Sequence, residues 1–230
     1  MASVHPSVRG AMPVRKIPKN HLCVTGSFAS RKNGGMNEFE SPLEKEYMLL
    51  LDFDERVERY ESQPVNIPIP GIPRGYTPDV LVFYLPDPNT GEFAKPLLTE
   101  VKHTDDLERN AAKYAPKFAL AEQYAVDRGW EFHVTTQVDI RTPRLSNLKF
   151  LREYRNISPA DRDRVELVRV ANKIGDVISP DSLLEHLAVS DDDRLYWLPI
   201  IWHAVLTRQL VADWNGPLDH NTVLRLSGNA

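Results

Sequence analysis

The sequence predicts an α/β protein with a mixed β-sheet and flanking helices, followed by a small winged-helix-like domain. Three observations predict this arrangement. Amphipathic helical segments alternate with short runs of β-branched and aromatic residues up to about residue 155. A polar junction, NISPADRD, follows at 156–163. Beyond it, three helical segments precede a tail that contains Asn215-Gly216, a dipeptide typical of hairpin turns.

Length and composition indicate an ordinary globular protein. The chain has 230 residues, of which 42% are hydrophobic and 26% charged. A chain of this length can bury a hydrophobic core without disulfides or structural metals. The single cysteine, Cys23, excludes an internal disulfide and a CxxC metal motif, and this fits a reducing compartment. No apolar run approaches the roughly 18–20 residues that span a bilayer. We therefore expect a cytoplasmic protein with no membrane partner.

Charge is distributed unevenly along the chain. Residues 1–37 contain no Asp or Glu, and six basic residues give this segment a charge of +6. We interpret 1–37 as a basic arm that contacts nucleic acid through phosphates, with a solvated tail as the alternative. From Ala160 onward, seven basic and eleven acidic residues give a net charge of −4. We interpret 159–230 as a winged-helix-like domain for partner docking, since this charge disfavours contact with DNA.

The first predicted helix follows the arm. Ser41 suits the N-cap, Pro42 suits the first helical position, and Glu44 falls where a capping box places its acid. An apolar stripe then predicts an amphipathic helix, and its members are Leu43, Tyr47, Leu50 and Leu51.

Strands and helices alternate after this helix. The segment 56–71 contains several prolines and predicts an edge strand followed by a second short strand, and 76–103 predicts two more strands. A long helix is expected at 105–128, with Asp105 or Asp106 as its cap, Gly129 at its end, and a kink or break at Pro116. A strand at 131–140 and a helix capped by Thr142 complete this part.

The segment YTPDVLVFYLPDPNTGEFAKPLLTEVKH, 76–103, places charged residues at the ends of its two strands. If the two strands form a hairpin whose loop is symmetric about Asn89/Thr90, Asp79 lies opposite Glu100 on the neighbouring strand. Lys102, two residues after Glu100, lies on the same strand face as Glu100. Like charges set opposite each other destabilise a sheet, so a divalent cation with oxygen ligands is the natural compensation. The alternative is a surface pair of Glu100 and Lys102, with Asp79 merely following a turn.

The two strands of this segment resemble a known nuclease motif. YTPDVLVFY and LLTEVKH match the PD-(D/E)xK nuclease motif. Together with ESPLEKEYMLLLDFDERVERYESQPV, they resemble the TnsA-type endonuclease subunit of heteromeric, Tn-seven-like bacterial transposases. The family's ES-x-LE helix, QP strand entry, YTPD strand and EVK strand occur in order across about 26–156, and IWHAVLTRQLVADWNGPLDHNTVL is similar to its winged-helix-like domain. The resemblance implies a restriction-endonuclease-like fold, with the nuclease domain at 38–158.

The resemblance also implies site residues. It makes Asp79 and Glu100 metal-binding acids and Lys102 the catalytic lysine, and it adds Glu44 as a further catalytic acid whose other interpretation is the capping box. The implied ion is Mg²⁺, for which Mn²⁺ may substitute, and its implied ligands are Glu44, Asp79, Glu100 and Val101. Gln63 is interpreted as a structural residue that could contact substrate. His103 is interpreted as an exposed residue at a strand end.

The implied function is cleavage of the 5′ ends of a transposon in double-stranded DNA. A separate DDE transposase subunit would cut and join the 3′ ends, and an AAA+ regulator ATPase would complete the assembly. Two alternatives stay open. The chain could be another PD-(D/E)xK nuclease of the restriction or junction-resolving kind, or a noncatalytic DNA-binding scaffold of the same fold.

Overall fold

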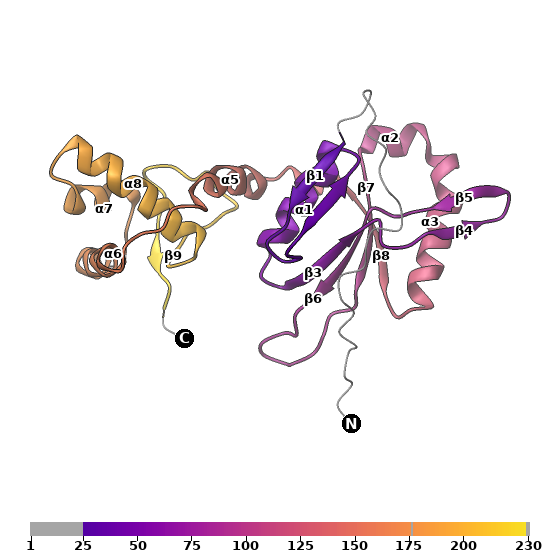
Figure 1. Cartoon of the computed structure of the whole chain (residues 1–230), viewed down its shortest axis with the longest axis horizontal. Helices are drawn as coiled ribbons and strands as arrows, with labels where there is room; N and C mark the ends of the chain where they lie inside the picture. The colour runs from indigo at the N-terminus through magenta and orange to yellow at the C-terminus, as the bar shows by residue number, and fades with distance from the viewer. Residues whose placement is uncertain (1–24, 176, 229–230) are drawn as a thin grey trace. The chain divides into compact units, whose positions relative to one another are not determined.

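The computed structural model describes residues 25–175 and 177–228, and the chain divides into two compact units at Ile140/Arg141. The first unit runs from indigo to pink in Figure 1 and contains the predicted nuclease strands, and the second runs from orange to yellow. Residues 1–24 of the predicted basic arm lie outside the described residues.

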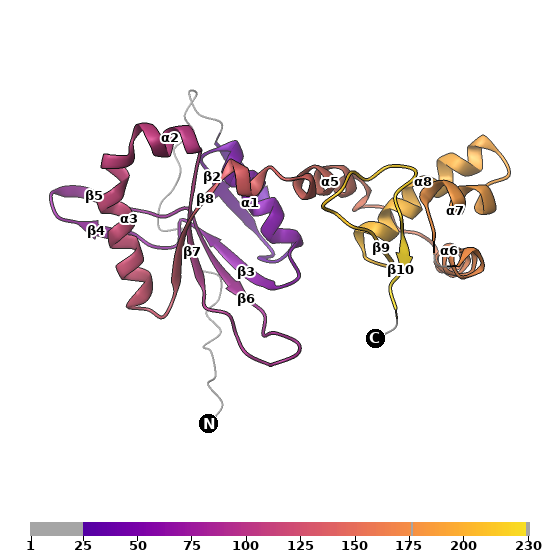
Figure 2. The same ribbon diagram turned by 180° about the vertical axis from the view of Figure 1, so that it is seen from behind.

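The first unit is built on a four-stranded sheet of order β3-β6-β7-β8. β3 and β7 are both antiparallel to β6, whereas β7 and β8 are parallel, so the sheet is mixed as predicted and β3 is an edge strand. Helices α1 and α3 lie on opposite sides of the sheet (Figures 1 and 2). The bounds are β3 (Val57–Ser62), β6 (Val80–Tyr84), β7 (Leu97–Lys102), β8 (Glu131–Thr136), α1 (Pro42–Phe53) and α3 (Ala111–Val126).

Helix α1 begins as predicted. The hydroxyl oxygen of Ser41 accepts a hydrogen bond from the backbone N–H of Glu44 at 3.2 Å. The carboxylate of Glu44 accepts two bonds, from the Ser41 hydroxyl and from the backbone N–H of Glu40, both at 2.8 Å. Donors that a helix start leaves unpaired are thus satisfied locally. The buried face includes Leu43, Tyr47, Met48, Leu49 and Leu51, while Leu50 is only half-buried.

Two hairpins accompany the sheet, and one of them is formed by the C-terminal part of the segment predicted to be a basic arm, 1–37. β1 (Gly26–Ala29) pairs with β2 (Met36–Phe39), so residues predicted to be a free arm belong to the fold. The ammonium group of Lys32, in the turn, donates to the backbone carbonyls of Asp54 and Val57. These bonds tie the turn of the hairpin to the segment that joins α1 to β3. The second hairpin joins β4 (Ile67–Ile69) and β5 (Ile72–Tyr76).

The long helix expected at 105–128 is two helices, α2 (Thr104–Arg109) and α3. They part at Asn110, not at Pro116, which lies inside α3. The Asn110 amide donates to the Asp106 carboxylate at 2.8 Å, and a side chain that bonds locally competes with helical backbone bonds. The cap prediction was also wrong, because His103 is the N-cap of α2 and both aspartates lie in its first turn.

The strand expected at 131–140 is shorter than predicted. β8 ends at Thr136 and a helical turn, α4 (Gln137–Ile140), follows. The carboxylate of Asp139 accepts bonds from the backbone N–H and the hydroxyl of Thr136, at 2.9 and 2.8 Å. This capping contact turns the chain out of the sheet. Thr142 then precedes α5 (Pro143–Leu151) as predicted, although its side chain makes no cap bond.

The second unit contains the helices expected near the C-terminus and a pair of short antiparallel strands. Its elements are α5, η1 (Arg152–Tyr154), α6 (Asp161–Ile174), α7 (Pro180–Leu187), α8 (Asp191–Leu206), β9 (Leu210–Val211) and β10 (Arg225–Leu226). Residues 141–158, expected in the nuclease domain, pack here instead. A ring nitrogen of His203 in α8 lies 2.9 Å from the Tyr154 carbonyl, and Phe150 packs edge-on against Trp202. The winged-helix-like description of this unit stays a prediction.

The Asn215-Gly216 turn does not join β9 to β10 directly. The two strands pair antiparallel, but all of 212–224 lies between them. The buried Asn147 amide of α5 donates to the carbonyls of Trp214 and Gly216, at 2.8 and 2.7 Å. These long-range bonds fix the turn in place and override the local hairpin preference.

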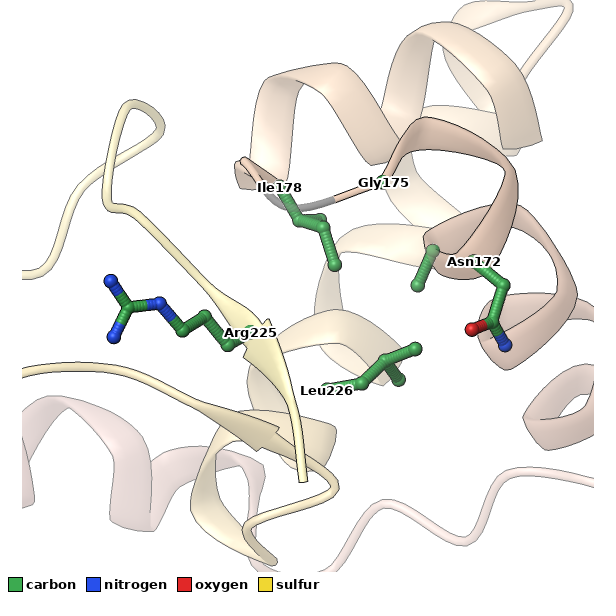
Figure 3. Close-up of a pocket in the computed structure, with 6 residues that line it drawn as sticks. Asn172, Gly175, Ile178, Arg225 and Leu226 are labelled. Atoms are coloured by element: carbon green, nitrogen blue, oxygen red, sulfur yellow. The ribbon is translucent and has the colours of Figure 1, made fainter. Parts of the chain in front are cut away.

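The second unit also contains a cavity of about 480 Å³ between the end of α6 and β10 (Figure 3). None of the predicted site residues lines it, and its lining comprises Ala171, Asn172, Gly175, Ile178, Arg225 and Leu226. Among the helices of the described residues, none has the length and apolar character needed to cross a membrane.

Candidate active site

The register of β6 and β7 brings two acids together. Val80 pairs with Thr99, and continuing this antiparallel register by one residue sets Asp79 level with Glu100. The backbone N–H of Asp79 donates to the Thr99 carbonyl at 3.1 Å, which holds the start of β6 against β7. The position of Asp79 opposite Glu100, predicted from a hairpin symmetric about Asn89/Thr90, is therefore confirmed.

Lys102 lies among three oxygen atoms at this point. Its Nζ is 2.7 Å from Oε1 of Glu100 and 3.6 Å from Oδ2 of Asp79, and it donates to the Val101 carbonyl at 3.1 Å. The three side chains are largely buried, with 5% of Glu100, 13% of Asp79 and 23% of Lys102 exposed. An ammonium group from the same strand thus compensates the two carboxylates.

Burial strengthens the electrostatic coupling among these groups. Loss of water raises the pKa of Asp79 well above its ordinary value, and the neighbouring Glu100 charge raises it further. For Lys102, burial lowers the pKa, but the Asp79 and Glu100 carboxylates outweigh burial and raise it above the usual lysine value. Lys102 therefore stays protonated at neutral pH.

Glu44 lies near this cluster but keeps its own partners. Burial raises the pKa of its carboxyl, and the charge of Lys102 partly opposes the rise. Both carboxylate oxygens are engaged in the capping bonds at the start of α1. Over residues 25–175 and 177–228, no three His, Cys, Asp or Glu side chains gather in a way that could hold a metal ion. The structure thus shows the capping role of Glu44, and its metal-binding role stays a prediction.

The donor set at Asp79 and Glu100 suits a hard divalent cation. Carboxylate and carbonyl oxygens are the ligands that Mg²⁺ prefers, and here two carboxylates meet the backbone carbonyl of Val101. The Lys102 ammonium already places a positive charge against all three oxygens. The residues present therefore fit the ion that the sequence resemblance implies.

Tyr76 is a neighbour that sequence reasoning missed. Its hydroxyl donates to Oε2 of Glu100 at 2.8 Å, and the side chain is buried. The residue belongs to the YTPD motif, so the sequence contained its position but no signal for its contact.

Gln63 is strained and buried beside the site. Its φ of 47° lies in the left-handed region, which is unfavourable for a residue with a Cβ. Its backbone N–H donates to the Asp79 carbonyl at 2.8 Å, and its side-chain amide donates to Glu40 at 3.1 Å. The oxygen of its side-chain amide, Oε1, is buried and has no hydrogen-bond partner among the described residues. These bonds agree with the structural interpretation of Gln63. His103 is exposed, as predicted.

Comparison with protein families identifies one segment of the chain. Residues 54–137 match the model of a family described as the TnsA-like endonuclease N-terminal domain. This segment spans the whole four-stranded sheet and contains Asp79, Glu100 and Lys102, whereas Glu44 and the second unit lie outside it. A search of curated proteins finds no match. The TnsA-type resemblance is therefore confirmed for 54–137, a nuclease domain of the kind found in Tn-seven-like transposases.

Proposed function

We propose that this chain is the metal-dependent endonuclease subunit of a heteromeric transposase, cutting the 5′ ends of the element beside a DDE transposase subunit. One observation carries the proposal. Within a TnsA-like segment, Asp79, Glu100 and Lys102 converge at the ends of two neighbouring strands, with the carboxylates largely buried and the lysine charged.

The residues of the site suit phosphodiester hydrolysis. Asp79, Glu100 and the Val101 carbonyl would hold Mg²⁺, or Mn²⁺ in its place. When bound, such an ion polarises the scissile phosphate and lowers the pKa of a bound water. Lys102, protonated and one-quarter exposed, can donate hydrogen bonds to phosphate oxygens and stabilise their growing negative charge. Glu44 is the further acid of this proposal, reached by releasing one capping bond.

The remaining parts of the chain are assigned by charge. The segment 1–24 carries Arg9, Arg15, Lys16 and Lys19 without any acid, which favours contact with DNA phosphates. The net charge of −4 beyond Ala160 favours docking of the second unit to a protein, for which we propose the DDE transposase subunit or an AAA+ regulator ATPase.

Reconstituted cleavage tests the proposal. The full chain is combined with the DDE transposase and ATPase encoded beside it and with DNA containing the transposon ends, and each strand is mapped. We expect Mg²⁺-dependent cuts at the 5′ ends, which Glu100→Ala would abolish while the 3′ cuts persist. Cutting at 5′ ends by Glu100→Ala would exclude this site.

The same assay separates the alternatives. A restriction-type or junction-resolving nuclease would cut DNA that lacks transposon ends without any partner subunit. A noncatalytic scaffold would leave the 5′ ends intact even where wild-type protein assembles with its partners.

A further inference from the structure

We propose that Tyr76 is a positioning residue that orients the Glu100 carboxylate for cation binding. The inference rests on the proposed function and deepens it, because it concerns how one ligand of that site is held. Tyr76 is the last residue of β5, which pairs with β4 and not with the strands of the main sheet. Its hydroxyl therefore reaches the site from a separate hairpin.

The ring of Tyr76 is fixed by packing. It belongs to a buried apolar cluster on the α3 side of the sheet, whose other buried members are Ile67, Leu81, Leu98 and Ala121. Phe132 and Trp130, partly buried, pack against the same cluster. Because the ring cannot shift without disturbing these contacts, the position of the hydroxyl is set by the core and not by the site itself.

The two oxygens of the Glu100 carboxylate have different partners. Oε2 accepts from the Tyr76 hydroxyl at 2.8 Å, while Oε1 lies 2.7 Å from Nζ of Lys102 and faces the group that also contacts Asp79. Rotation of the carboxylate would break both contacts. Tyr76 thus keeps Oε1 directed toward the Lys102 ammonium, which also contacts Asp79 and the Val101 carbonyl, and as a neutral donor it leaves the negative charge on Glu100. Hydrogen-bond partners of this kind commonly tune a metal ligand.

Tyr47, in helix α1, is a matched control whose hydroxyl approaches the opposite face of β7 from Glu100. Both tyrosines are 8% exposed. The Tyr47 hydroxyl lies 3.2 Å from Oγ1 of Thr99, the residue next to Glu100, and has no contact with a carboxylate of the site. Replacing either tyrosine by phenylalanine removes one buried hydroxyl, but only Tyr76→Phe changes a metal ligand.

Calorimetric titration of the full-length protein with Mn²⁺ tests the inference. We expect Tyr76→Phe to weaken Mn²⁺ binding about tenfold, as removal of a hydrogen bond to a metal ligand commonly does. Tyr47→Phe should bind within about twofold of wild type. In a Glu100→Ala background, Tyr76→Phe should cause no additional loss, because the two residues act as one unit. Circular dichroism melts of each variant in chelator report the fold independently of the metal.

The outcomes are distinguishable. Equal Mn²⁺ affinity of wild type and Tyr76→Phe overturns the role of Tyr76 and leaves the proposed function standing. Equal losses in Tyr76→Phe and Tyr47→Phe also overturn it, since they would reflect a general effect of removing a buried hydroxyl. An additional loss in the Glu100→Ala background would mean that Tyr76 does not act through Glu100. Absence of Mn²⁺ binding by wild type would instead overturn the proposed metal site.

Discussion

The ammonium nitrogen of Lys102 lies 2.7 Å from Oε1 of Glu100, two residues earlier on the same strand face, and 3.6 Å from Oδ2 of Asp79 on the neighbouring strand. Without this lysine, two largely buried carboxylates would face each other with no cation between them. The lysine therefore has two roles in the proposed enzyme, as a donor to substrate and as the internal counterion of the metal-free site.

Removing the lysine charge should destabilise the metal-free protein. We expect Lys102→Met to lower the free energy of unfolding in chelator by about 3 kcal/mol, because it leaves two buried carboxylates without a counterion. Adding Mn²⁺ should raise the free energy of unfolding more in this variant than in wild type. In the variant the ion compensates carboxylate charge that Lys102 compensates in wild type. Denaturant melts with and without Mn²⁺ measure both, with the exposed Lys113→Met as control. A loss of equal size in the control would contradict the counterion role.

Two substitutions of Asp79 separate charge from hydrogen bonding. Oδ2 of Asp79 accepts from the Val101 N–H at 2.7 Å, and an asparagine can keep this bond without its charge. In chelator, Asp79→Asn should be as stable as wild type or more so, because repulsion from Glu100 is removed. Asp79→Ala should lose about 1–3 kcal/mol, since a buried N–H is left unpaired. Both should lose Mn²⁺ binding. A clear fall in melting temperature for Asp79→Asn would make Asp79 a structural residue.

The strained backbone at Gln63 predicts an order of stabilities. Glycine adopts a φ of 47° freely and alanine does not, so Gln63→Gly should be about 1 kcal/mol more stable than Gln63→Ala, although both lose the bond to Glu40. Thermal melts of the two variants give the difference. If alanine proved the more stable of the two, the left-handed conformation of Gln63 would be wrong.

The capping contact that ends β8 predicts a dependence on pH. Hydrogen bonds from the Thr136 N–H and hydroxyl lower the pKa of Asp139 below its ordinary value. A carboxyl whose pKa is lowered on folding contributes stability above its unfolded pKa, and this contribution is lost as the pH falls through the lowered value. The stability advantage of wild type over Asp139→Ala should therefore be present at neutral pH and shrink in acid. An advantage independent of pH would argue against an ionised Asp139 in this contact.

We expect the hydrogen bonds of Asn147 to stabilise the second unit. Its buried amide donates to two carbonyls and its oxygen accepts from the Leu218 N–H at 3.3 Å, so Asn147→Ala leaves several backbone groups unpaired. We expect a loss of about 2–3 kcal/mol. Tryptophan fluorescence reports on this unit, because Trp197, Trp202 and Trp214 belong to it and only Trp130 lies in the first. Ser182→Ala, which removes only the two local bonds of the Ser182 hydroxyl to the Ser179 backbone at the start of α7, serves as the comparison with a smaller effect.

Local patterns in the sequence determined the start of α1, the mixed sheet and the register that sets Asp79 level with Glu100. Each depends on short-range rules: a capping serine with its acid, strand periodicity, and a hairpin whose symmetry fixes opposite residues. Lys102 also follows from such a rule, since residues two apart share a strand face.

Only the tertiary structure decided which long-range partners these residues meet. The contact of Tyr76 with Glu100 depends on packing of the β4–β5 hairpin against the sheet, and the hold of Asn147 on the turn at 214–216 joins residues about seventy positions apart. The ends of the elements were also missed where side chains competed with the backbone, at Asn110 and Asp139. Sequence periodicity describes which face a residue occupies. It cannot describe which side chain from a distant segment will satisfy a buried polar group there, because that depends on how the whole core packs.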